Sequence, residues 1–308
     1  MKLISENLHI ISKSIKEAIL IKDEKFIRNL LSKQIETNPD WIDLNIGPAR
    51  GAFSGTMEWL TNIVNDMTNI PISLDSTNIT EIENGLKRVK NPSDCIINST
   101  NADIDRLDRV TDLACKYGCK IIALTMNSEL GIPKESDKRL ELAFEINAIT
   151  ESKGLSNENI FFDPLILPIG IDQTQALEAL NTIRMLKESF EPQVLTTVGL
   201  SNVSNGCPKE IRSLINRVFM VMAMGCGLDS AIIDSFDAEL LRINKMIESQ
   251  TIQKDVDETY TSIYNMMKNF EDIDYIKYDI NDKDQLAIYK TTEILLNKKV
   301  YTNSYLDI

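Results

Sequence analysis

Short apolar segments rich in Ile, Val and Leu alternate with longer amphipathic segments along this chain as far as about residue 235. Eight of the short segments have the character of strands: residues 2–4, 42–46, 71–75, 95–98, 120–126, 160–163, 195–199 and 229–233. Helical periodicity is found between them, in residues 12–36, 55–67, 78–90, 104–117, 137–153, 174–189 and 209–226. This alternation implies parallel strands that are joined by right-handed crossovers.

Eight strand–helix repeats are the number that closes a parallel sheet into a (β/α)8 TIM barrel, a fold of the α/β class. A length of 308 residues suits one such barrel, so we expect a single domain over residues 1–308. The alternative is an open doubly wound sheet. It is disfavoured because no G-x-G-x-x-G motif follows the first strand.

The charge balance narrows the possible partners. The formal net charge is −13 and no cluster of Lys and Arg is present, so we expect neither nucleic acid nor a membrane as partner. The five cysteines form no CxxC pair and His9 is the only histidine, so we expect no metal site. No signal peptide or membrane span is apparent, which favours a cytoplasmic protein that binds a small molecule, a protein partner, or both.

Asp and Asn side chains follow five of the expected strands. They are Asp43 and Asn45, then Asp75 and Asn78, then Asn98 and Asn101, then Asp163, and finally Asn202. In a parallel barrel the carboxyl ends of all strands meet at one face, where the active site is built. Helix capping is an alternative role for polar residues in these segments. Asn78, Thr100 and Ser204 are placed to cap the helices that follow. Capping does not explain acids and amides at the last strand position itself.

The types of these residues indicate the kind of ligand. No Lys, His or Cys is positioned as an obvious nucleophile, and no glycine-rich phosphate cradle is present. An ionised carboxylate accepts hydrogen bonds from amino and ring N–H groups, and an amide both donates and accepts. This combination suits a flat heterocycle with alternating donors and acceptors, such as a pterin, better than it suits a phosphate.

The motifs DLNIGP, MEWL, LDSTN, INSTN, DPLILP, GLSNVS and INRVFMVMAMGCGLDSAI occur in this order along the chain. Together they resemble the methyltetrahydrofolate:corrinoid/iron–sulfur protein methyltransferases of the reductive acetyl-CoA pathway. The similarity covers residues 1 to about 245 and resumes at residues 291–301. The wider relatives are the pterin-binding barrels, which include dihydropteroate synthase and the folate module of cobalamin-dependent methionine synthase.

The resemblance implies a homodimer that moves the N5 methyl group of methyltetrahydrofolate to the Co(I) corrinoid of a corrinoid/iron–sulfur protein. The corrinoid then belongs to that partner and is not permanently bound here. The matching positions imply that Asp75, Asn98 and Asp163 hold the pterin and that Asn202 is the catalytic residue at N5. We assign Asn205 to the substrate site as well, together with Asp43 and Asn45, which either touch substrate or organise the first turns of the mouth.

The chain departs from the family pattern at three places. The family's amino-terminal GERIN is SENLH in residues 5–9, so His9 lies either at the pterin mouth or in a surface or packing position. The glutamine that follows GLSNVS in the family is Asn205 here, which is one methylene shorter. An acidic insert occupies residues 248–285. Its apolar residues recur at helical spacing, so we expect an amphipathic helix that packs on the barrel, as a surface elaboration or as a partner contact.

Three other functions remain possible from the sequence. A methyltransferase of an O-demethylase or glycine betaine system would use the same donor with another corrinoid partner. Dihydropteroate synthase would use the same barrel, although the match to INSTN and GLSNVS counts against it. A non-catalytic folate-binding or corrinoid-docking protein would not need Asn202, which is present.

Overall fold

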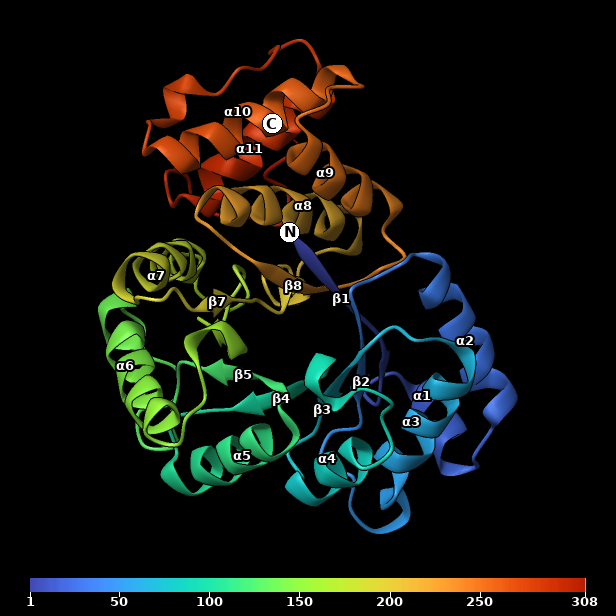
Figure 1. The fold of residues 1–308 in the computed structure, drawn as a ribbon. Coiled ribbons are helices and arrows are strands. Elements are labelled where there is room, and N and C mark those ends of the chain that lie inside the picture. The colour runs from blue at the N-terminus through green and yellow to red at the C-terminus, as the bar shows by residue number, and fades with distance from the viewer. Residues whose placement is uncertain (308) are drawn as a thin grey trace.

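The barrel that the sequence predicts is present in the computed structural model, which describes residues 1–307 (Figure 1). Its strands are β1 (Lys2–His9), β2 (Trp41–Asn45), β3 (Ile72–Asp75), β4 (Ile96–Thr100), β5 (Lys120–Leu124), β6 (Ile160–Asp163), β7 (Leu195–Thr196) and β8 (Ser230–Ile233). All pairs are parallel, in the order β7-β6-β5-β4-β3-β2-β1-β8. The ring closes where Ile232 N donates to Val198 O at 2.8 Å, beside a bridge between Gly199 and Ile232.

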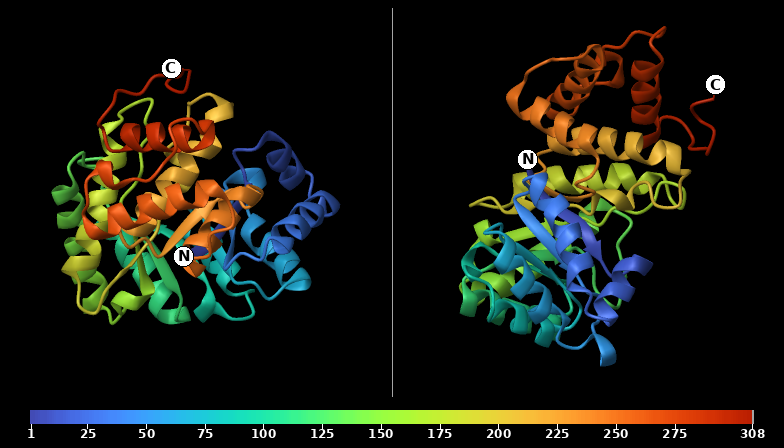
Figure 2. Two further views of the ribbon diagram at one scale, coloured as in Figure 1. Left: turned by 90° about the horizontal axis from the view of Figure 1, so that it is seen from above. Right: turned by 90° about the vertical axis from the view of Figure 1, so that its right-hand side faces the viewer.

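Helices follow the strands and cover the outside of the ring (Figures 1 and 2). They are α1 (Lys13–Leu20), α2 (Glu24–Glu36), α3 (Thr56–Met67), α4 (Ile79–Leu86), α5 (Ile104–Tyr117), α6 (Ser136–Ser152), α7 (Thr174–Ser189), α8 (Lys209–Gly225), α9 (Ala238–Ser249), α10 (Asp255–Asn269) and α11 (Lys283–Leu295). The helical segment expected over residues 12–36 is divided into two helices, α1 and α2. No helix within residues 1–307 is long and apolar enough to cross a bilayer.

Two strands differ in length from the sequence expectation by more than two residues. β1 runs to His9 instead of ending near residue 4, and its register with β2 shifts between Ser5 and Leu8. The polar residues in this bulge interrupt the apolar pattern, which is why the sequence predicted a shorter strand. β7 is only two residues long, but its backbone bonding continues, since Thr197 N donates to Phe162 O at 2.9 Å.

The inside of the ring is closed below the mouth by a small apolar layer. Ile4, Ile96, Ile122 and Phe161 are at most 2% exposed and pack together with the partly buried Trp41. Full burial of such side chains contributes roughly 1.5–3 kcal/mol each.

The expected helix of the acidic insert is α10, and its prediction is confirmed. Tyr260, Ile263 and Met267 are buried against the core that includes α8. A Cβ atom at Gly225 would lie 2.6 Å from the carbonyl oxygen of Tyr264, so this glycine lets α8 and α10 approach closely. Together α9, α10 and α11 form a helical layer that covers the outer face of α8 (Figure 1).

Candidate functional site

The strand-end residues lie in one row across four neighbouring strands. In the register of the sheet His9 of β1 lies opposite Asn45 of β2, Asn45 opposite Asp75 of β3, and Asp75 opposite Asn98 of β4. The row lies at the carboxyl end of the barrel, which is where sequence reasoning placed its members. The loops that follow these strands therefore surround a common mouth.

Hydrogen bonds join members of the row to one another and to residues beneath it. Asn45 Nδ2 donates to Asp75 Oδ2 at 2.5 Å, and Asn98 Nδ2 donates to Asp43 Oδ1 at 3.2 Å. Asp43 lies beneath the row, only 2% exposed, and also accepts from Ser73 Oγ at 2.6 Å. Asp43 thus holds the Asn98 amide in place from below.

The surroundings of Asp43 and Asp75 raise the pKa of both carboxyl groups. Burial raises the pKa of Asp43 to about 6, although the bonds from Ser73 and Asn98 lower it. Burial also raises the pKa of Asp75 well above its usual range, and the neighbouring Asp43 charge adds to this. The Arg106 charge opposes the shift at Asp75 without bonding to that carboxylate. A ligand that donates N–H groups to Asp75 would relieve this situation.

Asp163 ends β6 on another side of the mouth and is only 5% exposed. Its Oδ1 accepts from Leu165 N at 2.7 Å, and Leu165 adopts a positive φ of 65° in the turn that makes this contact. Burial raises the pKa of Asp163 to about 7. The charge of Arg139 lowers it, but the Arg139 guanidinium donates to Pro133 O and Gln175 Oε1 instead.

Asn202 closes the short 3₁₀ turn Leu200–Asn202 after β7, and its side chain is exposed at the mouth. Gly199 lies at the base of this turn and leaves room for the Asn202 side chain in this position, because a Cβ there would lie 2.8 Å from Asn202 Nδ2. Asn205 follows in the next turn and is also exposed. Within residues 1–307 no side-chain hydrogen bond joins Asn202, Asn205 or Asp163 to the row on β1–β4. The structure thus brings Asp43, Asn45, Asp75 and Asn98 together, and it places the other three separately.

The capping alternative holds for one residue of three. Asn78 Oδ1 accepts from Thr80 N at 3.1 Å and caps α4. Thr100 lies inside β4, and Ser204 lies in a turn well before α8, so neither caps a helix. The capping alternative was wrong for both: β4 runs two residues beyond its expected end at residue 98, and α8 begins where expected, at Lys209, with Pro208 at its N-cap.

One residue of the mouth was missed. Glu6 lies in the bulge of β1 and accepts a hydrogen bond from Ser201 Oγ, next to Asn202. Burial raises the pKa of Glu6 to about 7, while Ser201 lowers it and the charges of Asp43 and Asp234 raise it. The sequence signal for Glu6 was the acidic residue within SENLH, but only His9 of that segment was considered as a residue of the mouth. His9 itself has a buried Nδ1 without a partner among residues 1–307, and burial lowers its pKa.

Comparison with known proteins identifies the relatives of this site. The sequence model of the family "Pterin binding enzyme" matches residues 20–234. Methionine synthase of Mycobacterium leprae is 30% identical over 249 residues, which are 78% of this chain but 20% of that protein. The chain thus spans about a fifth of that synthase, and about a quarter (23%) of the methionine synthase of Mycobacterium tuberculosis.

A relative of similar length is the methylcorrinoid:tetrahydrofolate methyltransferase of Eubacterium limosum. It is 27% identical over 243 residues, which cover 78% of this chain and 88% of that protein. Among solved structures, dihydropteroate synthase from Vibrio fischeri superposes with a TM-score of 0.58 at 14% identity, over 82% of this chain and 94% of that one. Dihydropteroate synthase from Xanthomonas albilineans gives 0.59 at 15% identity, over the same shares. These structures establish the common barrel fold.

Proposed function

The chain belongs to the family of pterin-binding enzymes, and on that premise we propose that it is a methyltransferase acting between methyltetrahydrofolate and a corrinoid. In this proposal it moves the N5 methyl group of the folate to the Co(I) corrinoid of a partner protein, reversibly. Support comes from the Eubacterium limosum relative, whose name describes a transfer between a methylcorrinoid and tetrahydrofolate and which is matched over 88% of its length. The methionine synthases add weight over the matched part of their length.

The observation that carries the proposal is a pair of carboxylates, one half-buried and one buried, without a cation bonded to them. Asp75 and Asp163 lie at the mouth, and burial raises the pKa of each. A pterin presents an amino group and ring N–H groups along one edge, so it would donate hydrogen bonds to these acids. Asn98, held by Asp43, supplies both an amide donor and an acceptor for the remaining atoms of that edge.

Asn202 is proposed to act at N5. A tertiary amine is a poor leaving group unless positive character develops on its nitrogen, so a residue that stabilises this charge accelerates the transfer. The amide of Asn202 is exposed at the mouth and can hydrogen-bond N5 before and after protonation. The remaining task of the chain is to orient the methyl group for in-line attack.

In this proposal the methyl acceptor is a corrinoid that is carried by another protein and acts as a substrate. A Co(I) corrinoid supplies a strong nucleophile, so this chain needs none of its own. We propose a corrinoid/iron–sulfur protein as the partner, a homodimer as the working form and the cytoplasm as the location. The rival partners are the corrinoid proteins of O-demethylase or glycine betaine systems, which the pterin site does not distinguish.

A stopped-flow experiment tests the proposal. Methyltetrahydrofolate and enzyme are mixed with a reduced Co(I) corrinoid protein, and methylation of the corrinoid is followed by absorbance. We expect methylation at a rate that depends on enzyme concentration, with the fastest rate for the corrinoid/iron–sulfur protein. Tight folate binding without methylation of any corrinoid protein would instead indicate a non-catalytic folate-binding protein. Condensation of a pterin pyrophosphate with p-aminobenzoate would indicate a dihydropteroate synthase.

A further inference from the structure

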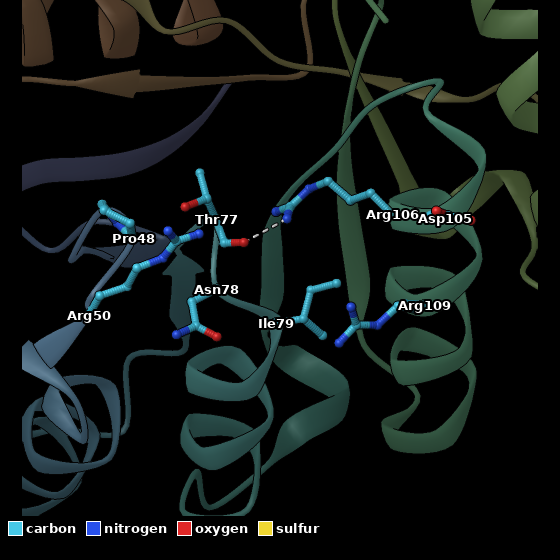
Figure 3. Close-up of a pocket in the computed structure, with 8 residues that line it drawn as sticks. All are labelled: Pro48, Arg50, Thr77, Asn78, Ile79, Asp105, Arg106 and Arg109. Atoms are coloured by element: carbon cyan, nitrogen blue, oxygen red, sulfur yellow. Dashed lines mark hydrogen bonds between the residues drawn. The ribbon is translucent and has the colours of Figure 1, made fainter. Parts of the chain in front are cut away.

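A cavity of about 340 Å³ opens beside the row of strand-end residues (Figure 3). Its walls come from the loop after β2, the loop after β3 and the first turns of α5, which follows β4. These are the same strand ends that carry Asn45, Asp75 and Asn98, so the cavity lies on the mouth side of the barrel. Its polar lining consists of Arg50, Thr77, Asn78, Asp105, Arg106 and Arg109.

Arg106 fixes the shape of the cavity. Its guanidinium donates to the carbonyl oxygens of Ser99 at 3.0 Å, of Thr77 at 2.9 Å and of Ser76 at 3.1 Å. These bonds tie the loops after β3 and β4 together, and the Thr77 bond is visible in Figure 3. Burial lowers the pKa of Arg106, and the charge of Asp75 opposes this lowering. The cavity therefore lies close enough to the row of strand-end residues for the two to interact electrostatically.

Arg50 and Arg109 approach the cavity from opposite sides and are both exposed (Figure 3). Neither forms a hydrogen bond or an ion pair with any residue in the range 1–307. Four other arginines of the chain do pair with acids, namely Arg28, Arg88, Arg217 and Arg242. The others donate to backbone carbonyl oxygens, so Arg50 and Arg109 are the two arginines of residues 1–307 without a hydrogen-bond partner, in a chain with 46 acids and 33 bases. With three arginines and Asp105, the lining carries a net charge of +2.

We propose that this arginine pocket binds carboxylate groups of the glutamate tail of the folate substrate. The inference rests on the proposed function, because it takes the pterin to lie on Asp75, Asn98 and Asp163. A folate has a polar ring at one end and carboxylates at the other, and each further glutamate adds one more carboxylate. The planar fork of a guanidinium matches a carboxylate in two-point geometry. The lining has a net positive charge and a tail with several glutamates is negatively charged, so the site favours polyglutamylated folate.

Equilibrium binding separates this proposal from the proposed function. We would measure the affinity of the full chain for methyltetrahydrofolate with one glutamate, for the triglutamate form, and for a methylated tetrahydropterin without a tail. The test variant is Arg50→Gln combined with Arg109→Gln. The matched control is Arg88→Gln, which removes an exposed guanidinium just beyond the far end of α4.

We expect the triglutamate to bind the wild-type protein more tightly than the monoglutamate, and the double variant to lose about tenfold of the triglutamate affinity. Affinity for the tail-less pterin should be unchanged, the control should behave as wild type, and added salt should reduce the triglutamate advantage. Equal loss for the tail-less pterin would overturn the proposal, as would equal affinities for the two folates in the wild-type protein. If inorganic phosphate bound as tightly as free p-aminobenzoyl-triglutamate, the pocket would be a general anion site and the proposal would also fail. Failure of every pterin form to bind would instead count against the proposed function.

Discussion

Buried acids are handled in opposite ways in two regions of this molecule. At the mouth, burial raises the pKa of Asp163 to about 7, and no cation bonds to its carboxylate among residues 1–307. In the helical layer, Asp257 at the start of α10 is fully buried, yet its pKa lies below its usual range. Burial opposes that lowering, but Arg242 bonds to both Asp257 oxygens, at 3.1 and 2.6 Å, and the backbone N–H groups of Gln253 and Lys254 donate as well.

The difference separates an acid with a structural role from the acids that we propose bind the ligand. Asp257 has all its partners within the chain, so its charge stabilises the junction of α9 and α10. Asp75 and Asp163 lack such a cation, so the folded state carries an electrostatic cost that a hydrogen-bonding ligand would offset. The comparison predicts that changes in the helical layer alter stability alone, and that changes at the mouth alter catalysis, binding and pH dependence.

The largest effect on stability should come from Arg242→Ala. Removal of the guanidinium leaves a buried carboxylate without its cation, so we expect the free energy of unfolding to fall by about 3–5 kcal/mol. Urea unfolding followed by circular dichroism measures this. Methyl transfer per folded molecule should stay at the wild-type rate. Arg88→Ala, which breaks an exposed pair with Glu58, is the control and should cost less than about 1 kcal/mol.

A second variant distinguishes the loss of the pair from a general loss of packing. Replacement of both Arg242 and Asp257 by leucine removes the unpaired charge, so we expect much of the lost stability to return. A double variant as unstable as Arg242→Ala would show that Asp257 does not require its cation, and the contrast between the two regions would fail.

Asn202→Ala should have the opposite pattern of effects: the rate of methyl transfer should fall while stability is retained. The side chain is exposed, so stability should change by less than about 0.5 kcal/mol. The rate of methyl transfer should fall about 10²–10³-fold, which is typical of losing one hydrogen bond to a developing charge. Single-turnover kinetics with saturating methyltetrahydrofolate measure the rate, and equilibrium binding shows whether affinity is retained. A near-normal rate with unchanged folate affinity would rule out the N5 role.

The pH dependence of stability tests the mouth directly. The pKa of Asp163 is raised from 3.8 to about 7 on folding, so its neutral form is favoured in the folded state. Its contribution is therefore fully present below about pH 4 and is lost as the pH rises through 7. Asp163→Asn should abolish this loss and raise the free energy of unfolding at pH 8 by about 2 kcal/mol relative to wild type.

Asp257→Asn provides the opposite control. The pKa of Asp257 is lowered, so its contribution is present above its unfolded value of 3.8 and is lost as the pH falls below it. Unfolding measured between pH 3 and 8 should therefore show a loss for Asp257→Asn that is greatest near neutrality. If both asparagine variants changed stability with the same sign at pH 8, the two acids would not differ as proposed.

The sequence predicted those parts of the site that follow from regular structure. Asn45 and Asp75 end their strands, and Asn98 ends the expected strand 95–98 although β4 runs on to Thr100, so the strand pattern alone places the three in one row. Asn202 was also found as a residue that follows a strand, but its role at N5 came from the resemblance alone, because it lies in a 3₁₀ turn three residues beyond Gly199, the last residue of the expected strand.

Other features depend on tertiary structure that leaves no local pattern. Glu6 lies in a bulge, where one extra residue changes which side chains face inward. The Arg242–Asp257 pair joins two helices, and its members look like ordinary surface charges in the sequence. Arg50 and Arg109 are separated along the chain and line one cavity only because β2 and β4, which precede them, lie on either side of β3 in the sheet.

The smallest effect should come from Asn205→Gln. Asn205 is exposed in the turn after Asn202, and its backbone N–H donates to Asn202 O at 3.2 Å. The resembling family has glutamine at this position, and the added methylene would restore the reach of the amide. We expect the affinity for methyltetrahydrofolate to rise about two- to fivefold, since a single exposed hydrogen bond contributes little.

Asn205→Ala is the matched control, and it decides between a lost contact and one that a water bridges. A lost contact predicts that alanine binds folate as tightly as the wild-type asparagine, whereas a bridged contact predicts weaker binding. Equal affinity of all three variants would show that no amide is needed at this position. The expected effects at the mouth thus differ with burial. An exposed amide changes the affinity for folate by a few-fold, whereas a buried acid changes the free energy of unfolding, because only the buried group has lost its water.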